Sequence, residues 1–307
     1  MEARRAGLRP LVIDKGALCN SLLHYPVNMV FFTTTERIEI GDLPMVSAGD
    51  KPTRNEALKY YRKAAAHYAL QVRLYENVTR IEGHDGSFTV HIKAQNGQAA
   101  RYTGRKIAIA TGYYDLPNLL GVPGENLPHV SHYYREAHPH WGQEVVVIGG
   151  KNSAAETALD LFRGGARVTL VHRHSELSPR IKYWVKPDIE NRIKAGEIRA
   201  LLGAQVTRIE PEQVWVRQNG AEQALPARAV YTMTGYHPDF EFLRRQGIAL
   251  EAENHKPAYN PKTHESNIAG IYLAGVVIGG KNTGEIFIEN GRFHGKQIAA
   301  ALVAKAH

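Results

Sequence analysis

Two short β-branched runs flank a glycine turn and a helical stretch between residues 144 and 172. Residues 144–148 read Glu-Val-Val-Val-Ile, two glycines follow, residues 157–162 have a helical apolar period, and residues 167–171 are a second apolar run. This order of strand, glycine turn, helix and strand predicts a βαβ unit with parallel strands. Similar alternation over most of the chain predicts an α/β fold with a largely parallel sheet.

The glycine turn after the first of these strands predicts a dinucleotide site. It reads Gly-Gly-Lys-Asn-Ser-Ala from residue 149, so Lys151 stands at the second glycine of the usual GxGxxG pattern. Glycines let the backbone approach a pyrophosphate, and the following helix directs its first N–H groups at the phosphates. The complete strand and helix context favours nucleotide binding over a purely structural turn.

The end of the second strand indicates which dinucleotide binds. An acid there accepts a hydrogen bond from the ribose 2′-hydroxyl of NAD, whereas this chain has His172, Arg173 and His174. A guanidinium suits a 2′-phosphate, so we expect NADPH, with Arg173 as the leading contact. Arg180 and Lys182 are candidate helpers, although ordinary surface charge explains these two equally well. The His-x-His pair lacks further ligands at a recognisable spacing, which argues against a metal site.

Residues 5–14 repeat residues 163–172 at a constant offset of 158, as a helix end, a glycine and a strand. Asp14 therefore occupies the position of His172, and an acid there suits the ribose of a second nucleotide. The counterpart of Gly149 would precede Met1, so this half lacks its first strand, its phosphate loop and most of its helix. We expect an upstream segment to supply them, and an apolar sheet edge to be exposed in its absence.

Two strands that run into Thr-Gly, at residues 106–112 and 229–235, are typical of the points where two-nucleotide flavoproteins cross between domains. Residues 270–275 form another strand with a small-residue turn, and residues 281–284 lead into a helix predicted over residues 285–295. The N-terminus of that helix could face a flavin, whose reduced ring is anionic. A packing helix that closes the domain is an equally good interpretation.

Charge and composition exclude several classes of function. The 38 Lys and Arg are dispersed among 30 acids, which argues against nucleic-acid binding despite a net charge of +8. A single cysteine, Cys19, allows no internal disulfide or Cys-x-x-Cys redox centre and favours a reduced, cytoplasmic setting. No apolar run approaches the roughly 20 residues of a membrane helix, and residues 1–10 lack the apolar core of a signal peptide.

A family resemblance extends over nearly the whole chain. It is carried by residues 25–42, 51–61, 110–115, 147–153, 233–239 and 285–295. These segments resemble the thioredoxin-reductase-like flavoprotein disulfide reductases, and most closely the YpdA-type bacillithiol-disulfide reductases, in which the degenerate glycine turn is usual. The resemblance implies two Rossmann-like domains. The FAD domain is discontinuous, with residues 1–117 and 238–307, and the NADPH domain, residues 118–237, is inserted between its parts.

The resemblance also implies cofactors, site residues and a reaction. The FAD residues are Asp14, Lys15, Asn20, Ser21, Thr111, Gly112, Gly275, Glu285 and Ile286. The NADPH residues are Gly149, Gly150, Lys151, Asn152, Ser153, Arg173, Arg180, Lys182 and Gly235. NADPH would pass a hydride to FAD, and the electrons would then reduce a small-molecule disulfide, bacillithiol disulfide before others. The implied assembly is a homo-oligomer.

Departures from the family pattern leave the catalytic residue unknown. The family's cysteine lies in the FAD glycine loop, which this sequence lacks, and Cys19 follows the next strand instead, where a small packing residue is the better interpretation. The absence of Cys-x-x-Cys, and Val276 where thioredoxin reductases usually have Asp, argue against thioredoxin as substrate.

Two alternatives stay open at this point. Residues 123–149 resemble the linker before the NADPH site of flavin monooxygenases, but four residues rather than three separate Gly124 from His129. A non-catalytic NADPH-binding protein is the alternative from a different class, and it applies if the chain binds no FAD.

Overall fold

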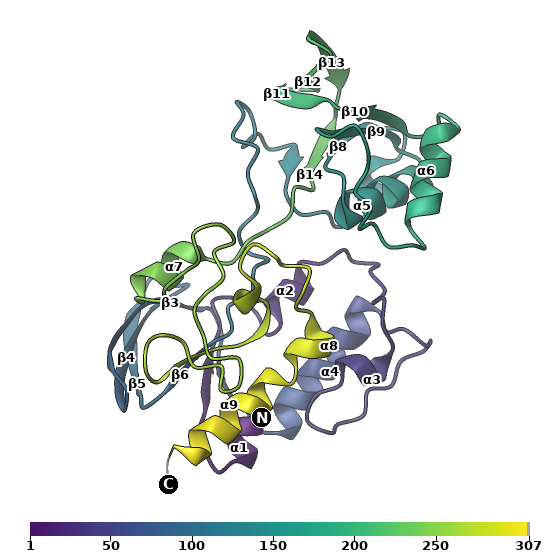
Figure 1. Ribbon diagram of the computed structural model, residues 1–307. Coiled ribbons are helices and arrows are strands. Elements are labelled where there is room, and N and C mark those ends of the chain that lie inside the picture. Colours follow the sequence, from purple (N-terminus) through teal and green to yellow (C-terminus); the bar gives the residue numbers. More distant parts are fainter. Residues whose placement is uncertain (306–307) are drawn as a thin grey trace. The chain divides into compact units, whose positions relative to one another are not determined.

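The computed structural model describes residues 1–305, which fold into two compact units (Figure 1). The first unit contains Met1–Leu23, Met29–Leu116 and the chain from Tyr236 on, and the second contains Pro117–Gly235. The short segment His24–Asn28 groups with the second unit, although it lies within the first part of the chain. Apart from this short segment, the chain leaves the first unit after one Thr-Gly turn and returns to it after another.

A five-stranded parallel sheet forms the centre of the second unit. Its strand order is β10 (Arg199–Leu202), β9 (Arg167–His172), β8 (Glu144–Ile148), β14 (Ala229–Thr232) and β7 (Val130–Ser131). One face carries α5 (Asn152–Arg163) and α6 (Lys186–Lys194), and the short η1 (His138–His140) precedes β8. The other face is covered by an antiparallel meander of β11 (Gln205–Glu210), β12 (Gln213–Gln218) and β13 (Ala221–Pro226).

The apolar run of β8 is explained by its central position, because both faces of this strand are buried. Val145 and Val147 pack with the α5 side of the sheet, whereas Val146 and Ile148 pack with the meander. Helix α5 presents a stripe of small apolar residues to the sheet, including Ala154 and Ala158, which are fully buried. The predicted strand, helix and strand between residues 144 and 172 are therefore confirmed.

The first unit contains two separate pairs of parallel strands instead of one continuous sheet. They are β1 (Leu11–Ile13) with β2 (Gln71–Arg73), and β6 (Ile107–Ile109) with β15 (Ile271–Leu273). A second meander, β3 (Glu76–His84), β4 (Ser87–Ala94) and β5 (Ala99–Gly104), completes its strands. Its helices are α1 (Glu2–Arg5), α2 (Asn20–Leu23), α3 (Thr35–Ile38), α4 (Arg54–His67), α7 (Phe240–Arg245), η2 (Gly275–Gly279), α8 (Ile288–Gly291) and α9 (His294–Ala304).

The two units repeat one arrangement, except at one strand. The 158-residue offset places β1 on β9, and both units add an antiparallel meander before a strand that runs into Thr-Gly. No counterpart of β8 occurs in the first unit among residues 1–305. Leu11 and Val12 are accordingly 41% and 44% exposed, whereas Leu170 in β9 is fully buried. The expected apolar edge is confirmed, while the upstream segment that would cover it stays a prediction.

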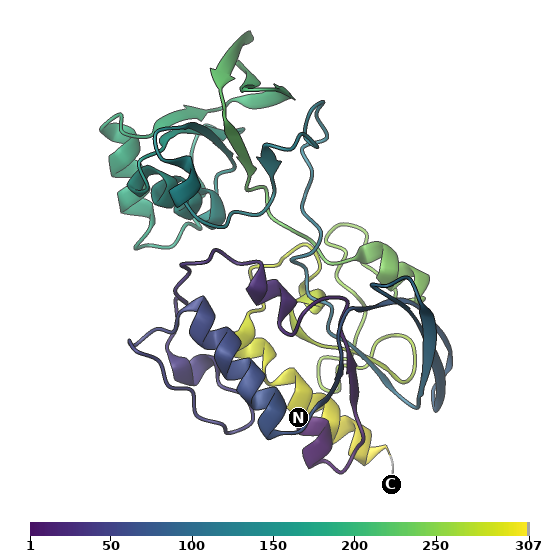
Figure 2. The same ribbon diagram turned by 180° about the vertical axis from the view of Figure 1, so that it is seen from behind.

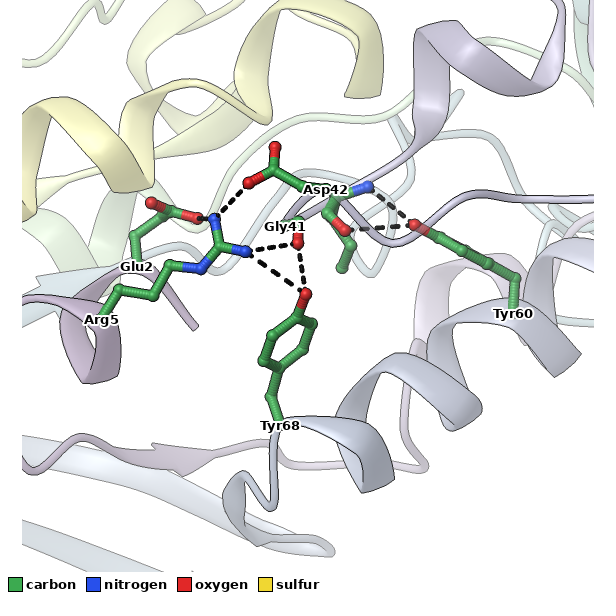
Figure 3. A network of polar contacts seen from close by, with 7 residues as sticks. Glu2, Arg5, Gly41, Asp42, Tyr60 and Tyr68 are labelled. Carbon is green, nitrogen blue, oxygen red and sulfur yellow. Dashed lines mark hydrogen bonds and ion pairs between the residues drawn. The ribbon is translucent and has the colours of Figure 1, made fainter.

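Helix α1 contacts α9, and a network of polar contacts holds it against the turn before α4 (Figures 2 and 3). The Arg5 guanidinium donates to Asp42 Oδ2 at 2.8 Å and to the carbonyl oxygen of Gly41 at 2.6 Å. The hydroxyl of Tyr68, directly after α4, donates to the same carbonyl. Gly41 has φ +65°, a left-handed conformation that glycine adopts without strain.

The helix predicted over residues 285–295 is wrong in its start and continuity. Residues 285–287 form a loop, α8 begins at Ile288, and α9 begins at His294. The side chain of Asn290 causes this arrangement, because its Oδ1 accepts from Phe287 N at 2.8 Å and its Nδ2 donates to Glu285 O at 2.9 Å. These bonds close the loop into a cap, and α8 is too short to provide a helix dipole for a flavin.

Candidate dinucleotide sites

The turn between β8 and α5 has the backbone geometry of a phosphate loop. Gly149 has φ +149°, and a Cβ there would lie 2.5 Å from the carbonyl oxygen of Met233 on the neighbouring strand segment. A Cβ on Gly150 would lie 2.3 Å from the imidazole ring of His172. Helix α5 then begins at Asn152, with Lys151 at its N-cap and no side-chain cap, so its first N–H groups have no intrahelical partner. This arrangement suits a phosphate group.

The basic residues near this turn differ in whether an acid neutralises them. Lys182 is paired with Glu156 of α5 at 2.8 Å. In contrast, Lys151, Arg173 and Arg180 have no carboxylate within ion-pair distance in the part of the chain that the structure describes. Uncompensated cations repel one another, and they are stabilised by a bound anion. The second unit therefore carries excess positive charge around its glycine turn.

The pKa of the His172 imidazole reflects the same excess of positive charge. Its pKa is lowered, first by burial and then by the neighbouring His174, Arg173 and Lys151. The rings of His172 and His174 lie 5.1 Å apart, edge to face. Within residues 1–305 no group of three or more possible ligands gathers to hold a metal ion.

The side chain of Asn152 joins the start of α5 to the loop after β9. Its Nδ2 donates to the carbonyl oxygen of Arg180 at 3.3 Å, and its Oδ1 accepts from the backbone N–H of Lys182 at 2.9 Å. The backbone N–H of Ser178 donates to Gly150 O at 2.9 Å. The Asn152 amide is thus occupied by the protein, and Ser153, its exposed neighbour, has no such bond. The expected phosphate role of Asn152 is restricted to its backbone.

The chain segments at the crossover are tied together in each unit. Asn118 N donates to Gly235 O at 2.9 Å, and Thr234 Oγ1 donates to Asn118 O at 2.6 Å. Within the first unit, His237 N donates to Leu116 O at 3.0 Å. Gly235 has φ +88°, so the turn needs glycine there. The Thr-Gly signal located this turn, but only the structure identifies Asn118 as its partner.

In the first unit, the expected FAD residues at the end of β1 form a tight turn. Asp14 Oδ1 accepts from Gly16 N at 2.8 Å, which leaves its second oxygen available for a ribose hydroxyl. Asn20, which starts α2 before Ser21, accepts from Ala17 N at 3.2 Å. Lys15 forms an ion pair of 3.1 Å with Asp115, which lies shortly after β6 and its Thr-Gly turn. This pair draws the end of β1 toward the turn after β6.

Thr111, Gly112 and Gly275 lie at a common edge of the first unit. The register pairs Leu273 with Ile109, so both turns follow the carboxyl ends of adjacent parallel strands. Ligands of α/β sheets bind at this edge. Gly275 has φ +75°, and its N–H donates to Nδ1 of His294 at 3.0 Å, a contact that sequence reasoning missed. Burial and then the neighbouring His264 lower the pKa of His294, so it accepts this bond as a neutral ring.

Two expected FAD residues, Glu285 and Ile286, belong to the capped loop before α8. Glu285 is paired with Lys256 at 3.2 Å. Ile286 packs against the apolar core of the first unit, close to Gly291. Their side chains are therefore engaged within the protein. The backbone of Glu285 is also bonded, since its N–H donates to Asn282 O at 3.3 Å and its carbonyl oxygen accepts from Asn290 Nδ2 at 2.9 Å.

Cys19 is a poor nucleophile in this environment. Burial raises the pKa of its thiol to about 11, and the Asp14 carboxylate contributes to the same shift. A thiol with that pKa is almost entirely protonated at neutral pH, whereas the thiolate is the reactive form. Cys19 also has φ +58°, an unusual conformation for a residue with a side chain. These observations agree with a packing role.

A family model for pyridine nucleotide-disulphide oxidoreductases matches residues 1–275. The chain belongs to this family. Bacilliredoxin reductase Bdr of Bacillus subtilis (strain 168) is 41% identical to it over 305 residues, which are 98% of this chain and 92% of that protein.

Two solved structures from the family share the fold over the whole chain. Bacillithiol disulfide reductase Bdr (YpdA) from Bacillus cereus superposes with a TM-score of 0.96 at 40% identity, covering 99% of this chain and 94% of that one. The corresponding structure from Staphylococcus aureus gives a TM-score of 0.92 at 39% identity, covering 100% and 94%. The chain is a thioredoxin-reductase-like oxidoreductase that depends on FAD and NADPH, as the sequence predicted.

The residues of the second unit fit NADPH. The glycine turn gives backbone access, α5 offers free N–H groups, and the unneutralised Arg173 and Arg180 suit the 2′-phosphate. In the first unit, Asp14, Gly112 and Gly275 fit the nucleotide of FAD. No counterpart of the Gly149–Gly150 turn occurs there among residues 1–305, so we assign no pyrophosphate contact of FAD.

Proposed function

We propose that this chain is an NADPH-dependent flavoprotein reductase of a low-molecular-weight disulfide, with bacillithiol disulfide as the substrate. The observation that carries the NADPH half is the pair Arg173 and Arg180 near a glycine turn, for which residues 1–305 supply no acidic partner. The substrate half is supported by the solved relatives from Bacillus cereus and Staphylococcus aureus, which are named for bacillithiol disulfide.

The overall reaction balances as one NADPH, one proton and one disulfide giving NADP⁺ and two thiols. Two electrons leave the nicotinamide as a hydride, and the disulfide bond breaks when it accepts them. Bound FAD supplies the chemistry that accepts a hydride and releases two electrons. The protein provides no Cys-x-x-Cys among its residues, and Cys19 stays protonated. We therefore assign no thiolate of residues 1–305 to the electron transfer.

The binding residues have distinct tasks in this proposal. Arg173 and Arg180 select the 2′-phosphate, and the first N–H groups of α5 bind the pyrophosphate of NADPH. Asp14 accepts hydrogen bonds from the FAD ribose. Gly112, Gly235 and Gly275 supply left-handed turns at the strand ends that let the backbone approach its ligands. Glu285 is bonded within the protein through its side chain and its backbone, so of the loop before α8 only Ile286 is assigned a backbone contact.

An NADPH oxidation assay tests the proposal. We expect the purified protein to show flavin absorbance and to oxidise NADPH in proportion to added bacillithiol disulfide, with two thiols released for each NADPH. Cystine, glutathione disulfide and an oxidised bacilliredoxin serve as competing substrates, the last because the Bacillus subtilis relative is named for it. Faster turnover of any competitor would refute the substrate assignment.

Two results would refute the enzyme class. Oxygenation of an added substrate in a fixed ratio to NADPH would instead support the monooxygenase alternative. A colourless protein that binds NADPH and catalyses no electron transfer would support the non-catalytic alternative.

The proposal further includes a cytoplasmic location and a homo-oligomer. Cell fractionation tests the location, and light scattering tests the oligomeric state. Among residues 1–305 the structure has no helix long and apolar enough to cross a membrane.

A further inference from the structure

Asn152 forms a bridge that neither the glycine pattern nor the proposed reaction explains. It is the first residue of α5, and its amide reaches the loop after β9. The carbonyl oxygen of Arg180 accepts from Nδ2 at 3.3 Å, and Lys182 N donates to Oδ1 at 2.9 Å. One partner is an acceptor and the other a donor, so this arrangement fixes the orientation of the amide. The bridge spans the backbone on both sides of Ile181.

The rest of this loop is anchored to the same turn and helix. Ser178 N donates to Gly150 O at 2.9 Å, and Arg180 N donates to Ser178 Oγ at 3.2 Å. Ile181 is buried, with 4% of its surface exposed. Lys182 Nζ donates to Glu156 of α5 at 2.8 Å. The backbone of the loop is therefore held at several points.

Arg180 is the exception within this anchored loop. Its side chain is exposed, and no carboxylate of the described residues pairs with it. Its guanidinium is held only through its backbone, which is fixed at Ser178 on one side and at Asn152 on the other. Because the backbone is already held, binding of an anion by Arg180 costs the conformational entropy of its side chain but not that of the loop.

We propose that Asn152 is a positioning residue for the recognition of the 2′-phosphate: it sets the place of Arg180 and thereby favours NADPH over NADH. The inference rests on the proposed function, because it takes the ligand of this site to be NADPH. It adds a residue that touches no phosphate through its side chain but acts through Arg180. Arg173, at the strand end, is not part of this bridge, and its Nε donates to Nε2 of His174 at 3.3 Å.

Equilibrium binding of NADP⁺ and NAD⁺ to the purified full chain tests this role without turnover. Asn152→Ala removes both bonds, and we expect affinity for NADP⁺ to fall about tenfold, the effect of a displaced Arg180 that loses about one charged hydrogen bond to the 2′-phosphate, while affinity for NAD⁺ changes less than about twofold. Binding of 2′,5′-ADP and 5′-AMP should differ in the same way.

A matched control comes from the first unit. Asn267 also bridges two backbone groups two residues apart, donating to Gly247 O at 3.0 Å and accepting from Ala249 N at 2.9 Å. Asn267→Ala removes an equivalent pair of bonds and should leave both affinities unchanged. Melting temperatures of all variants report whether the fold is retained.

A double-mutant cycle distinguishes positioning from general damage. If Asn152 acts through Arg180, Arg180→Ala should lower NADP⁺ affinity, and adding Asn152→Ala to it should cost little more. Additive losses, or equal losses for NADP⁺ and NAD⁺, would overturn the positioning role while leaving the proposed function intact. A wild-type chain that binds both dinucleotides equally would overturn the NADPH assignment itself, and with it the role of Asn152.

Discussion

Removal of the Arg173 guanidinium tests the assignment of NADPH to the second unit most directly. Arg173 follows β9, is exposed, and has no acidic partner among the described residues. Arg173→Ala therefore leaves no buried or unpaired acid behind, and we expect the fold to be unaffected. Any loss in NADP⁺ affinity then reflects the lost contact with the ligand and not a rearrangement of the protein's own ion pairs.

The expected magnitude follows from the kind of contact that is lost. A hydrogen bond to a charged group contributes about 1.5–3 kcal/mol, and each 1.36 kcal/mol corresponds to about a tenfold change in affinity. Because Arg173 is exposed, solvent and salt screen its charge, and the lower end applies. We expect NADP⁺ affinity to fall roughly 10- to 30-fold at low salt and NAD⁺ affinity to stay within about twofold.

The assay is equilibrium titration of NADP⁺ and NAD⁺ at two salt concentrations. Arg167→Ala is the matched control, because Arg167 lies at the opposite end of β9, where its guanidinium pairs with Glu144. Lys182→Ala should have a smaller effect than Arg173→Ala, since Glu156 already neutralises Lys182. An unchanged ratio of NADP⁺ to NAD⁺ affinity in Arg173→Ala would refute this assignment. An equal change of that ratio in Arg167→Ala would refute it as well.

Three further predictions concern the rest of the chain. Gly149→Ala should lower the melting temperature far more than Gly142→Ala, because a Cβ at residue 149 meets Met233 O at 2.5 Å whereas residue 142 has nothing within 4 Å; similar losses would contradict this. Cys19→Ser should retain disulfide-dependent NADPH oxidation within about twofold, because the thiol with pKa about 11 is protonated; inactivation would identify Cys19 as catalytic. Folding lowers the pKa of His294 below 6.5, so the unfolded chain binds more protons and unfolding free energy should fall as pH drops below 6.5. Calorimetric pH profiles should be flatter in His294→Gln, and an unchanged slope would exclude this group.

The sequence predicted those parts of the fold that depend on local pattern. Apolar runs of β-branched residues bounded by glycines located β8, β9, β14 and β15, and the 158-residue offset located β1. These elements were predictable because strand periodicity and glycine turns are properties of neighbouring residues. The helix predicted from residue 285 was wrong, since the side chain of Asn290, five residues later, caps a loop there.

The site was predictable in its positions but not in its contacts. The pattern placed Asn152 and Lys182 at the NADPH site, yet the first bonds the loop backbone and the second pairs with Glu156. Such contacts join residues about thirty positions apart, and no local pattern encodes them. The sequence did not predict the bond from Gly275 N to His294 for the same reason, because it depends on how η2 and α9 are placed in the fold.

The degenerate glycine pattern, finally, follows from what each position touches in the folded chain. Gly149 is required by Met233 O, and Gly150 is required by the ring of His172. The third position of the pattern, Ala154, is fully buried against the sheet, where a small side chain suffices. Lys151 instead has an extended backbone with φ −114° and an exposed side chain, so nothing in the protein demands glycine there. A lysine at this position brings a cation to the start of α5. Its charge would attract a bound pyrophosphate, which offsets the larger distance between the pyrophosphate and the backbone.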